Sequence, residues 1–126
     1  MKFQPDRLDG VNVVSRAEAG RLWVHQTPFT GSVLVPWRGE VQAWPASSPA
    51  ALTAEHFEQV LALRPELVIF GSGSALTFVR PALYRALIDA RIGVETMDTA
   101  AACRTFNVLV TEGRRVVGAL LIDTAV

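Results

Sequence analysis

Two stretches of the sequence gather polar side chains of the types that bind ligands. The first is ETMDTAAACRTFN at 95–107, where small and apolar residues are interrupted by Asp98, Thr99, Arg104, Thr105 and Asn107. The guanidinium group of an arginine presents a fork of N–H donors that matches planar oxyanions. This stretch therefore predicts a candidate binding site for an anion or a carboxylate, centred on Arg104.

A structural role for Arg104 is the alternative. If Asp98 or Thr99 caps a helix, Arg104 lies within reach of the first turn, where the Asp98 carboxylate can pair with it. Long basic side chains also bury their stems while the charged head stays in water. We favour this ion pair over a ligand site, because the acidic partner is already present locally.

The second stretch, Gly71-Ser72-Gly73-Ser74, directly follows the apolar run LVIF at 67–70. Glycines after a strand permit a tight turn and a close approach of the backbone to phosphate groups. The third glycine of the dinucleotide-binding motif is missing, however, and Pro81 delays the next predicted helix. We favour a sharp turn at the edge of a sheet, and a nucleotide site is the weaker alternative.

The first part of the chain has the pattern of β-strands. The segments VNVV, RLWV, SVLVPW and EVQAW are rich in β-branched and aromatic residues. The turns between them are too short for crossovers, so antiparallel pairing is expected.

Helices and strands alternate in the second part of the chain. Thr53 has the position of an N-cap, Pro81 suits the first turn of a helix, and a third helix is expected at about 100–110. Strands are expected at 67–70, 93–97 and 116–122. The core faces of the last two helices are predicted to carry Leu83, Tyr84, Leu87 and Ile88, and Ala102, Cys103, Phe106, Leu109 and Val110. This alternation predicts an α/β fold in one domain, with the later strands mostly parallel.

The two polar stretches both follow the carboxyl ends of strands in the predicted sheet. In open α/β sheets, crevices form at that edge. We therefore expect Gly71–Ser74 and Asp98–Asn107 to line the same hollow.

Composition restricts the classes of partner. Twelve basic residues balance twelve acidic ones in a chain of 126, without a long basic run, so no nucleic-acid partner is expected. Apolar runs are strand-sized, which predicts no membrane span. The charged N-terminus MKFQPDRLDG does not resemble a signal peptide, and the single cysteine suits a reducing compartment. These features predict a cytoplasmic protein.

Reactive groups are sparse and poorly grouped. His25 and His56 lie far in sequence from Cys103, and no spacing typical of metal ligands occurs. Cys103 falls on the predicted core face, where a thiol is inert. Ser72 and Ser74 are not in a nucleophile elbow. We expect no metal and no cofactor, and the case for an enzyme is weak.

From about Phe29 to Ile122 the chain resembles a known family. The resemblance is carried by VIFGSGS, GVETMDTAAACRTFNVL and EGRRVVGALL. The family is the small domain shared by mitochondrial NADH:ubiquinone oxidoreductase complex assembly factor 3, a vertebrate adipogenesis-associated protein and many uncharacterised bacterial and archaeal proteins. Its characteristic residues correspond here to Gly71, Gly73, Met97, Asp98, Thr99, Ala102, Arg104, Thr105, Asn107, Glu112, Gly113 and Arg114. The chain departs at Ser72 and Phe106, where threonine and tyrosine are expected.

The resemblance implies a three-layer α/β fold with a mixed central sheet and a small antiparallel β layer. It also implies a non-catalytic protein-interaction module, similar to the respiratory-complex assembly factor, with an unidentified protein partner. The alternative function is a small-molecule or anion-binding protein, or an enzyme, that uses the hollow at the strand ends. A homodimer through the exposed part of the β layer is a further alternative.

Overall fold

The computed structural model describes residues 10–123, so nearly all of the N-terminal stretch interpreted above lies outside the described residues. The strands are β1 (Val14–Glu18), β2 (Arg21–Val24), β3 (Thr27–Phe29), β4 (Val33–Pro36), β5 (Gln42–Ala43), β6 (Leu67–Gly71), β7 (Gly93–Met97) and β8 (Val116–Leu120). The α-helices are α2 (Ala54–Leu61), α3 (Arg85–Asp89) and α4 (Thr99–Thr111), with short 3-10 turns η1 (Pro49–Ala51) and η2 (Pro81–Tyr84).

The central sheet is mixed, with the strand order β5-β4-β8-β6-β7. Strands β6, β7 and β8 are parallel to one another, whereas β4 is antiparallel to both β5 and β8. The later strands are thus parallel and the earlier ones antiparallel, which confirms the predicted division of the chain.

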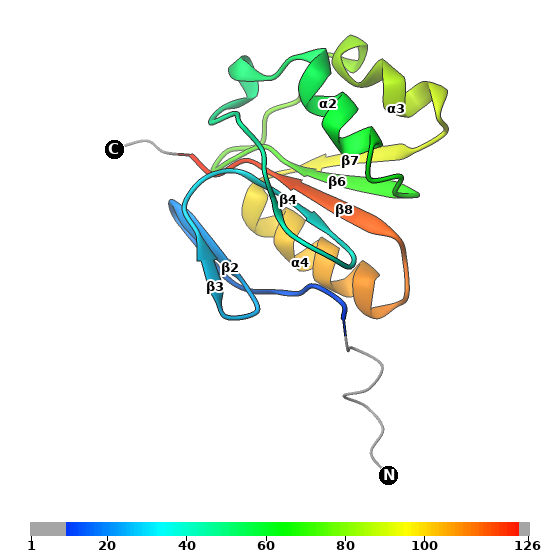
Figure 1. The fold of residues 1–126 in the computed structure, drawn as a ribbon. Coiled ribbons are helices and arrows are strands. Elements are labelled where there is room, and N and C mark those ends of the chain that lie inside the picture. The colour runs from blue at the N-terminus through cyan, green and yellow to red at the C-terminus, as the bar shows by residue number, and fades with distance from the viewer. Residues whose placement is uncertain (1–9, 124–126) are drawn as a thin grey trace.

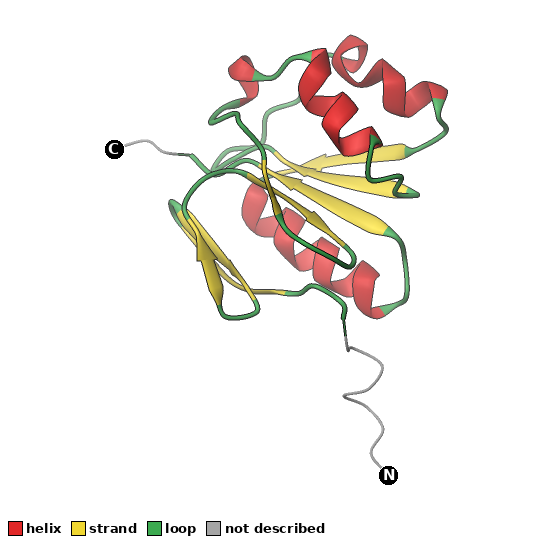
Figure 2. Cartoon of the chain, in the orientation of Figure 1, coloured by secondary structure: helices red, strands yellow, loops and turns green. Residues whose placement is uncertain are grey.

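Helices cover both faces of this sheet, so the molecule has three layers (Figure 1). Helices α2 and α3 lie on one face, and α4 lies on the other together with the small sheet (Figure 2). The crossover from β6 to β7 and the crossover from β7 to β8 run in opposite directions across the sheet. Because such crossovers are right-handed, α3 and α4 must lie on opposite faces. The predicted three-layer α/β fold is confirmed.

The early strands do not form one continuous sheet. Strands β1, β2 and β3 make a separate antiparallel sheet, and β3 was not expected from the sequence. The first strand also begins at Val14, at the end of the segment VNVV, and continues through polar residues to Glu18. Its exposed positions explain why hydrophobic pattern alone misplaced it.

Each face of the central sheet has its own hydrophobic cluster. One cluster, which includes the fully buried Phe106, joins the sheet to α4 and the small sheet, and the other joins it to α2 and α3. Thr53 caps α2 as predicted, in a reciprocal capping box whose second member is His56. Ile88 on α3 was expected in the core but is 49% exposed, because α3 is a short helix that buries only Leu87.

Helix α4 begins against strand β6 and ends in a Schellman motif. A Cβ atom added at Gly71 would lie 2.9 Å from the Cα of Thr99, so only glycine permits this approach. At the other end Gly113 has φ of +85°, and the N–H groups of Gly113 and Arg114 donate to the carbonyls of Val110 and Leu109. Two family-characteristic glycines therefore position one helix.

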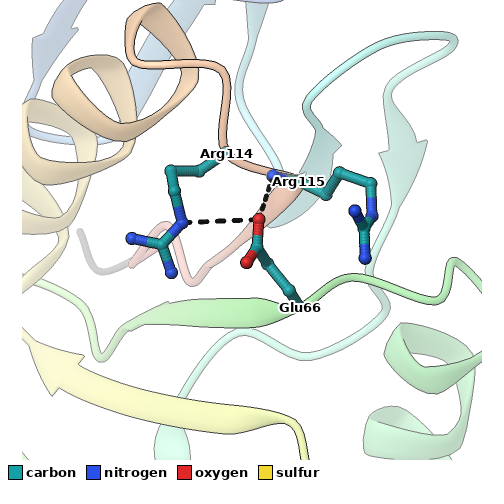
Figure 3. A network of polar contacts seen from close by, with 3 residues as sticks. All are labelled: Glu66, Arg114 and Arg115. Carbon is teal, nitrogen blue, oxygen red and sulfur yellow. Dashed lines mark hydrogen bonds and ion pairs between the residues drawn. The ribbon is translucent and has the colours of Figure 1, made fainter.

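The amino ends of β6 and β8 are joined by a polar network (Figure 3). Glu66 donates its N–H to the Arg115 carbonyl at 2.8 Å, and the Arg115 N–H donates to Glu66 Oε2 at 2.8 Å. Arg114 Nε lies 3.3 Å from the same oxygen. The backbone hydrogen bond from Arg115, helped by Arg114, lowers the pKa of Glu66 below its usual value against an opposing desolvation effect. The network fixes the register of two parallel strands.

Within residues 10–123 no helix is long and apolar enough to cross a membrane. The same residues contain no group of three or more histidine, cysteine or acidic side chains that could hold a metal ion.

Replacing Gly71 by alanine should lower the free energy of unfolding by about 1–3 kcal/mol, because the new methyl group meets the backbone of α4. Urea denaturation measures this change. Gly31→Ala is the matched control, since nothing lies within 4 Å of its Cβ position. Equal stability of the two variants would show that α4 can retreat from β6 at little cost.

Replacing Glu66 by glutamine should lower the melting temperature at neutral pH while keeping a hydrogen-bond acceptor for Arg115. The folded-state pKa of Glu66 is lowered, so its charge stabilises the fold above the unfolded pKa of 4.5. That contribution is lost as pH falls through the folded pKa. The difference in melting temperature between the variant and the wild type should therefore close in acid, and a constant difference across the range would contradict the assignment.

Candidate functional site

A cavity of about 500 Å³ opens at the carboxyl ends of β6, β7 and β8. Its walls come from four segments: 17–22 in the β1–β2 hairpin, 73–74 after β6, 98–100 at the start of α4, and 121–123 after β8. This is the edge at which α/β sheets form crevices. Of the residues that the shared-hollow hypothesis named, the structure brings Gly73, Ser74, Asp98 and Thr99 together here, whereas Gly71 and Ser72 lie outside the lining.

Thr99 holds the floor of this cavity in place. Its Oγ1 accepts a hydrogen bond from the Gly73 N–H at 2.8 Å and donates to the Leu121 carbonyl at 2.7 Å. Its own N–H donates to the Gly73 carbonyl at 2.9 Å. One residue at the start of α4 therefore ties the segments that leave β6 and β8.

The GSGS stretch is a structured turn. The buried Ser72 Oγ donates to the Ala75 carbonyl at 2.8 Å and accepts from the Thr77 N–H at 3.0 Å. Gly73 has φ of +107°, a conformation that side chains disfavour. These bonds support the sharp turn that the sequence favoured over a nucleotide loop.

Asp123 closes the cavity beside Gly73, and sequence reasoning did not single it out. Its Oδ2 accepts from the Ser74 N–H at 2.9 Å and from the Ser74 hydroxyl at 2.5 Å. An added Cβ on Gly73 would lie 2.5 Å from Asp123 Oδ1, so the missing side chain makes room for the carboxylate. No local pattern marks Asp123, because its partner stands 49 positions earlier in the chain.

Asp98 is the N-cap of α4, and the predicted ion pair with Arg104 is wrong. The Asp98 Oδ1 accepts from the Ala101 N–H at 2.8 Å. Arg104 is exposed, and the structure of residues 10–123 contains no ion pair between the two. The backbone N–H group offers Asp98 a fixed partner, whereas the long arginine side chain extends into water.

Asn107 explains why a largely buried helix carries an amide. Its side-chain oxygen accepts from the Val14 N–H at 2.8 Å, and its side-chain nitrogen donates to the Val14 carbonyl at 2.8 Å. The amide thus pairs with β1 as a neighbouring strand would, and it fastens the small sheet to α4. Arg104, Thr105 and Asn107 all lie outside the cavity lining.

The charges around the cavity favour a cation over an anion. Three acidic residues, Glu18, Asp98 and Asp123, line the cavity with one basic residue, Arg21, and Glu18 is ion-paired with Arg16, which leaves a formal charge of −1. The N-terminus of α4 adds about +0.5 of an elementary charge from the helix dipole, too little to reverse the sign. Glu18 and Arg21 come from the β1–β2 hairpin, whose position against α4 the sequence did not reveal.

Cys103 is buried on the core side of α4. Burial raises the pKa of its thiol to about 11, against an opposing effect of the Arg104 charge. The thiol is therefore protonated near neutral pH and does not line the cavity.

A family model described as "Protein of unknown function (DUF498/DUF598)" matches residues 14–121. The chain belongs to this family. The match begins at residue 14, so the family domain includes the small sheet that the resemblance over 29–122 left out.

Relatives with curated names and solved structures are similar to this chain. It is 40% identical over 84 residues to NADH dehydrogenase (ubiquinone) 1 alpha subcomplex assembly factor 3 of Bos taurus, covering 65% of this chain and 45% of that protein. The chain thus spans about half the length of the assembly factors it matches.

Two Bordetella structures share the fold. The crystal structure of a Bordetella parapertussis protein is 39% identical, with a TM-score of 0.86 over 90% of this chain and 98% of that one. The solution structure of a Mth938-like domain from Bordetella pertussis is 33% identical, with a TM-score of 0.83 over 98% and 93% of the two chains.

Replacing Asn107 by alanine should reduce the free energy of unfolding by about 1–3 kcal/mol, because Val14 then loses both partners of its backbone groups. Arg104→Ala on the same helix should change it by less than about 0.5 kcal/mol, as for other exposed side chains. Guanidinium denaturation of the two variants compares them directly. If Arg104→Ala cost as much as Asn107→Ala, the exposed, unpaired description of Arg104 would be wrong.

Proposed function

We propose that this protein is a non-catalytic interaction module of the cytoplasm that assists the assembly of a respiratory complex by binding a protein client. The observation that carries the proposal is the 40% identity to an NADH dehydrogenase assembly factor. The proposal concerns this domain alone, because the relative is about twice as long as the matched region.

An exposed apolar loop supports this role. Leu76 is 55% exposed and Phe78 is 72% exposed, and both lie on the loop that leads from β6 to η2. The loop begins at the cavity, because Ser74 is one of the cavity-lining residues. Large exposed apolar side chains that lie close together are typical of protein-binding surfaces. We place the client on this loop and on the adjoining cavity mouth.

The alternative of an anion-binding protein is not favoured. Its central residue, Arg104, lies outside the cavity, and the residues that line the cavity carry an excess of negative charge. A carboxylate or phosphate entering there would be repelled by Asp98 and Asp123.

Deleting the gene in its own host should reduce the amount of assembled NADH dehydrogenase complex, measured by native gel electrophoresis with an activity stain. The wild-type gene should restore the complex, and a Leu76→Ser, Phe78→Ser variant should restore it poorly. Val108→Ser is the matched control, since Val108 is also 55% exposed but lies on α4. An unchanged complex in the deletion strain would refute the assembly role.

A further inference from the structure

Strand β1 presents a free backbone edge to the cavity. Its pairing with β2 places Glu18 opposite Arg21 across a two-residue turn and Ala17 opposite Leu22. In an antiparallel ladder, pairs that exchange hydrogen bonds alternate with pairs whose N–H and C=O groups point away from each other. The pair that closes a two-residue hairpin exchanges hydrogen bonds, so the Ala17–Leu22 pair does not.

Two further observations fix this alternation. Pro28, which has no N–H, stands opposite Trp23, as expected where β2 and β3 exchange no hydrogen bonds. The pairing of Leu22 with Phe29 then directs the Leu22 backbone groups toward β3. Val14, opposite Val24, turns its N–H and C=O outward, because the Asn107 amide binds both of them. A β-bulge between Val14 and Arg16 shifts the alternation by one residue, so that Val14 and Ala17 both turn their backbone groups outward.

On the outward edge of β1, one residue therefore has hydrogen-bond partners for its backbone groups and another has none. Asn107 fills the position at Val14. The next outward position, Ala17, is exposed and belongs to the cavity lining, where the described residues provide no partner for its backbone groups. An extended peptide bound at Ala17 would continue the pairing that Asn107 begins.

The charge of the cavity selects the kind of peptide. Asp98 uses Oδ1 for the helix cap and Asp123 uses Oδ2 for Ser74, which leaves each carboxylate one oxygen with no described partner. Glu18 is already paired with Arg16 on the surface. A lysine or arginine side chain of a bound strand could donate charge-assisted hydrogen bonds to the two remaining oxygens.

We propose that the cavity binds an extended basic segment of a client protein, which adds as a strand to β1 at Ala17 and places a lysine or arginine side chain between Asp98 and Asp123. The inference rests on the proposed function for the existence of a client, and it names the segment by which the client is held. The apolar loop with Leu76 and Phe78 adjoins the same mouth through Ser74.

The binding test uses a short fluorescent peptide of alternating valine and lysine, measured by anisotropy with the full chain. A matched peptide of alternating valine and glutamate should bind at least about tenfold more weakly, since electrostatic complementarity decides between them. A lysine peptide N-methylated at alternate amides should also lose binding, because strand addition needs its N–H groups. Equal binding of the lysine and glutamate peptides would overturn the proposal.

Variants of the protein locate the contact. Ala17→Pro removes an outward N–H without breaking the ladder with β2, and should weaken lysine-peptide binding about tenfold. Ala17→Val introduces a side chain similar in size to proline but keeps the N–H, so this variant should bind the lysine peptide normally. Asp98→Asn combined with Asp123→Asn keeps the cap and the Ser74 acceptor but removes both charges, and should abolish the preference for lysine over glutamate.

Two further readouts make the outcome decisive. Amide chemical shifts should change at Ala17 and Asp98 when the lysine peptide is added, and changes confined to other surfaces would overturn the proposal. Sedimentation of the unliganded protein tests whether a second copy occupies the edge. If the unliganded protein is a dimer and the Ala17→Pro substitution dissociates it, the β1 edge is occupied by a second copy of this chain. That result would overturn the proposal of a client segment.

The failure of this inference can be told from the failure of the proposed function. If the gene deletion impairs complex assembly and Ala17→Pro restores it fully, the client binds elsewhere and only the inference fails. If the lysine peptide binds as described while the deletion leaves the complex intact, the site stands and the assembly role fails.

Discussion

One hydroxyl group holds together the edge of the central sheet at which the parallel strands end. Thr99 starts α4 directly beyond β7, and its Oγ1 is bonded both to the segment after β6 and to the segment after β8. Three parallel strands therefore end at a common point. The glycines at 71 and 73 permit this convergence, because side chains there would meet the Thr99 backbone and the Asp123 carboxylate. The cavity exists because these three chain segments are fixed while the hairpin lies across their mouth.

The sequence was sufficient to predict those elements whose signals are local. Periodicity and caps identified β6, β7 and α4 closely, and of the two cap residues that the sequence offered, Asp98 and Thr99, Asp98 is the N-cap. The division into two sheets was not predictable in this way, since β4 and β5 have the same strand pattern as β2. What places them in the central sheet is the pairing of β4 with β8, which lies more than eighty positions later in the chain, and the pairing of β5 with β4.

The polar residues show the same limit of prediction from local sequence patterns. Because Arg104 is unusual within an apolar stretch, the sequence predicted an anion site or an ion pair there, yet its side chain extends into water. Asn107 had the weaker signal and makes the more consequential contact, with a strand 93 positions away. Asp123 and the hairpin residues of the cavity had no signal at all. Side chains that bind distant backbone groups cannot be recognised from spacing, because the spacing that matters exists only in the folded chain.

The position of β8 in the sheet has a consequence for biosynthesis. This strand is the last regular element within residues 10–123, yet it lies between β4 and β6 and is buried along its whole length. While the chain is still emerging from the ribosome, β4 and β6 have no strand between them, so the central sheet cannot close. The central sheet can therefore close only after β8 has been synthesised and has left the ribosome. Until then the nascent chain exposes two unpaired strand edges, which chaperones are suited to protect.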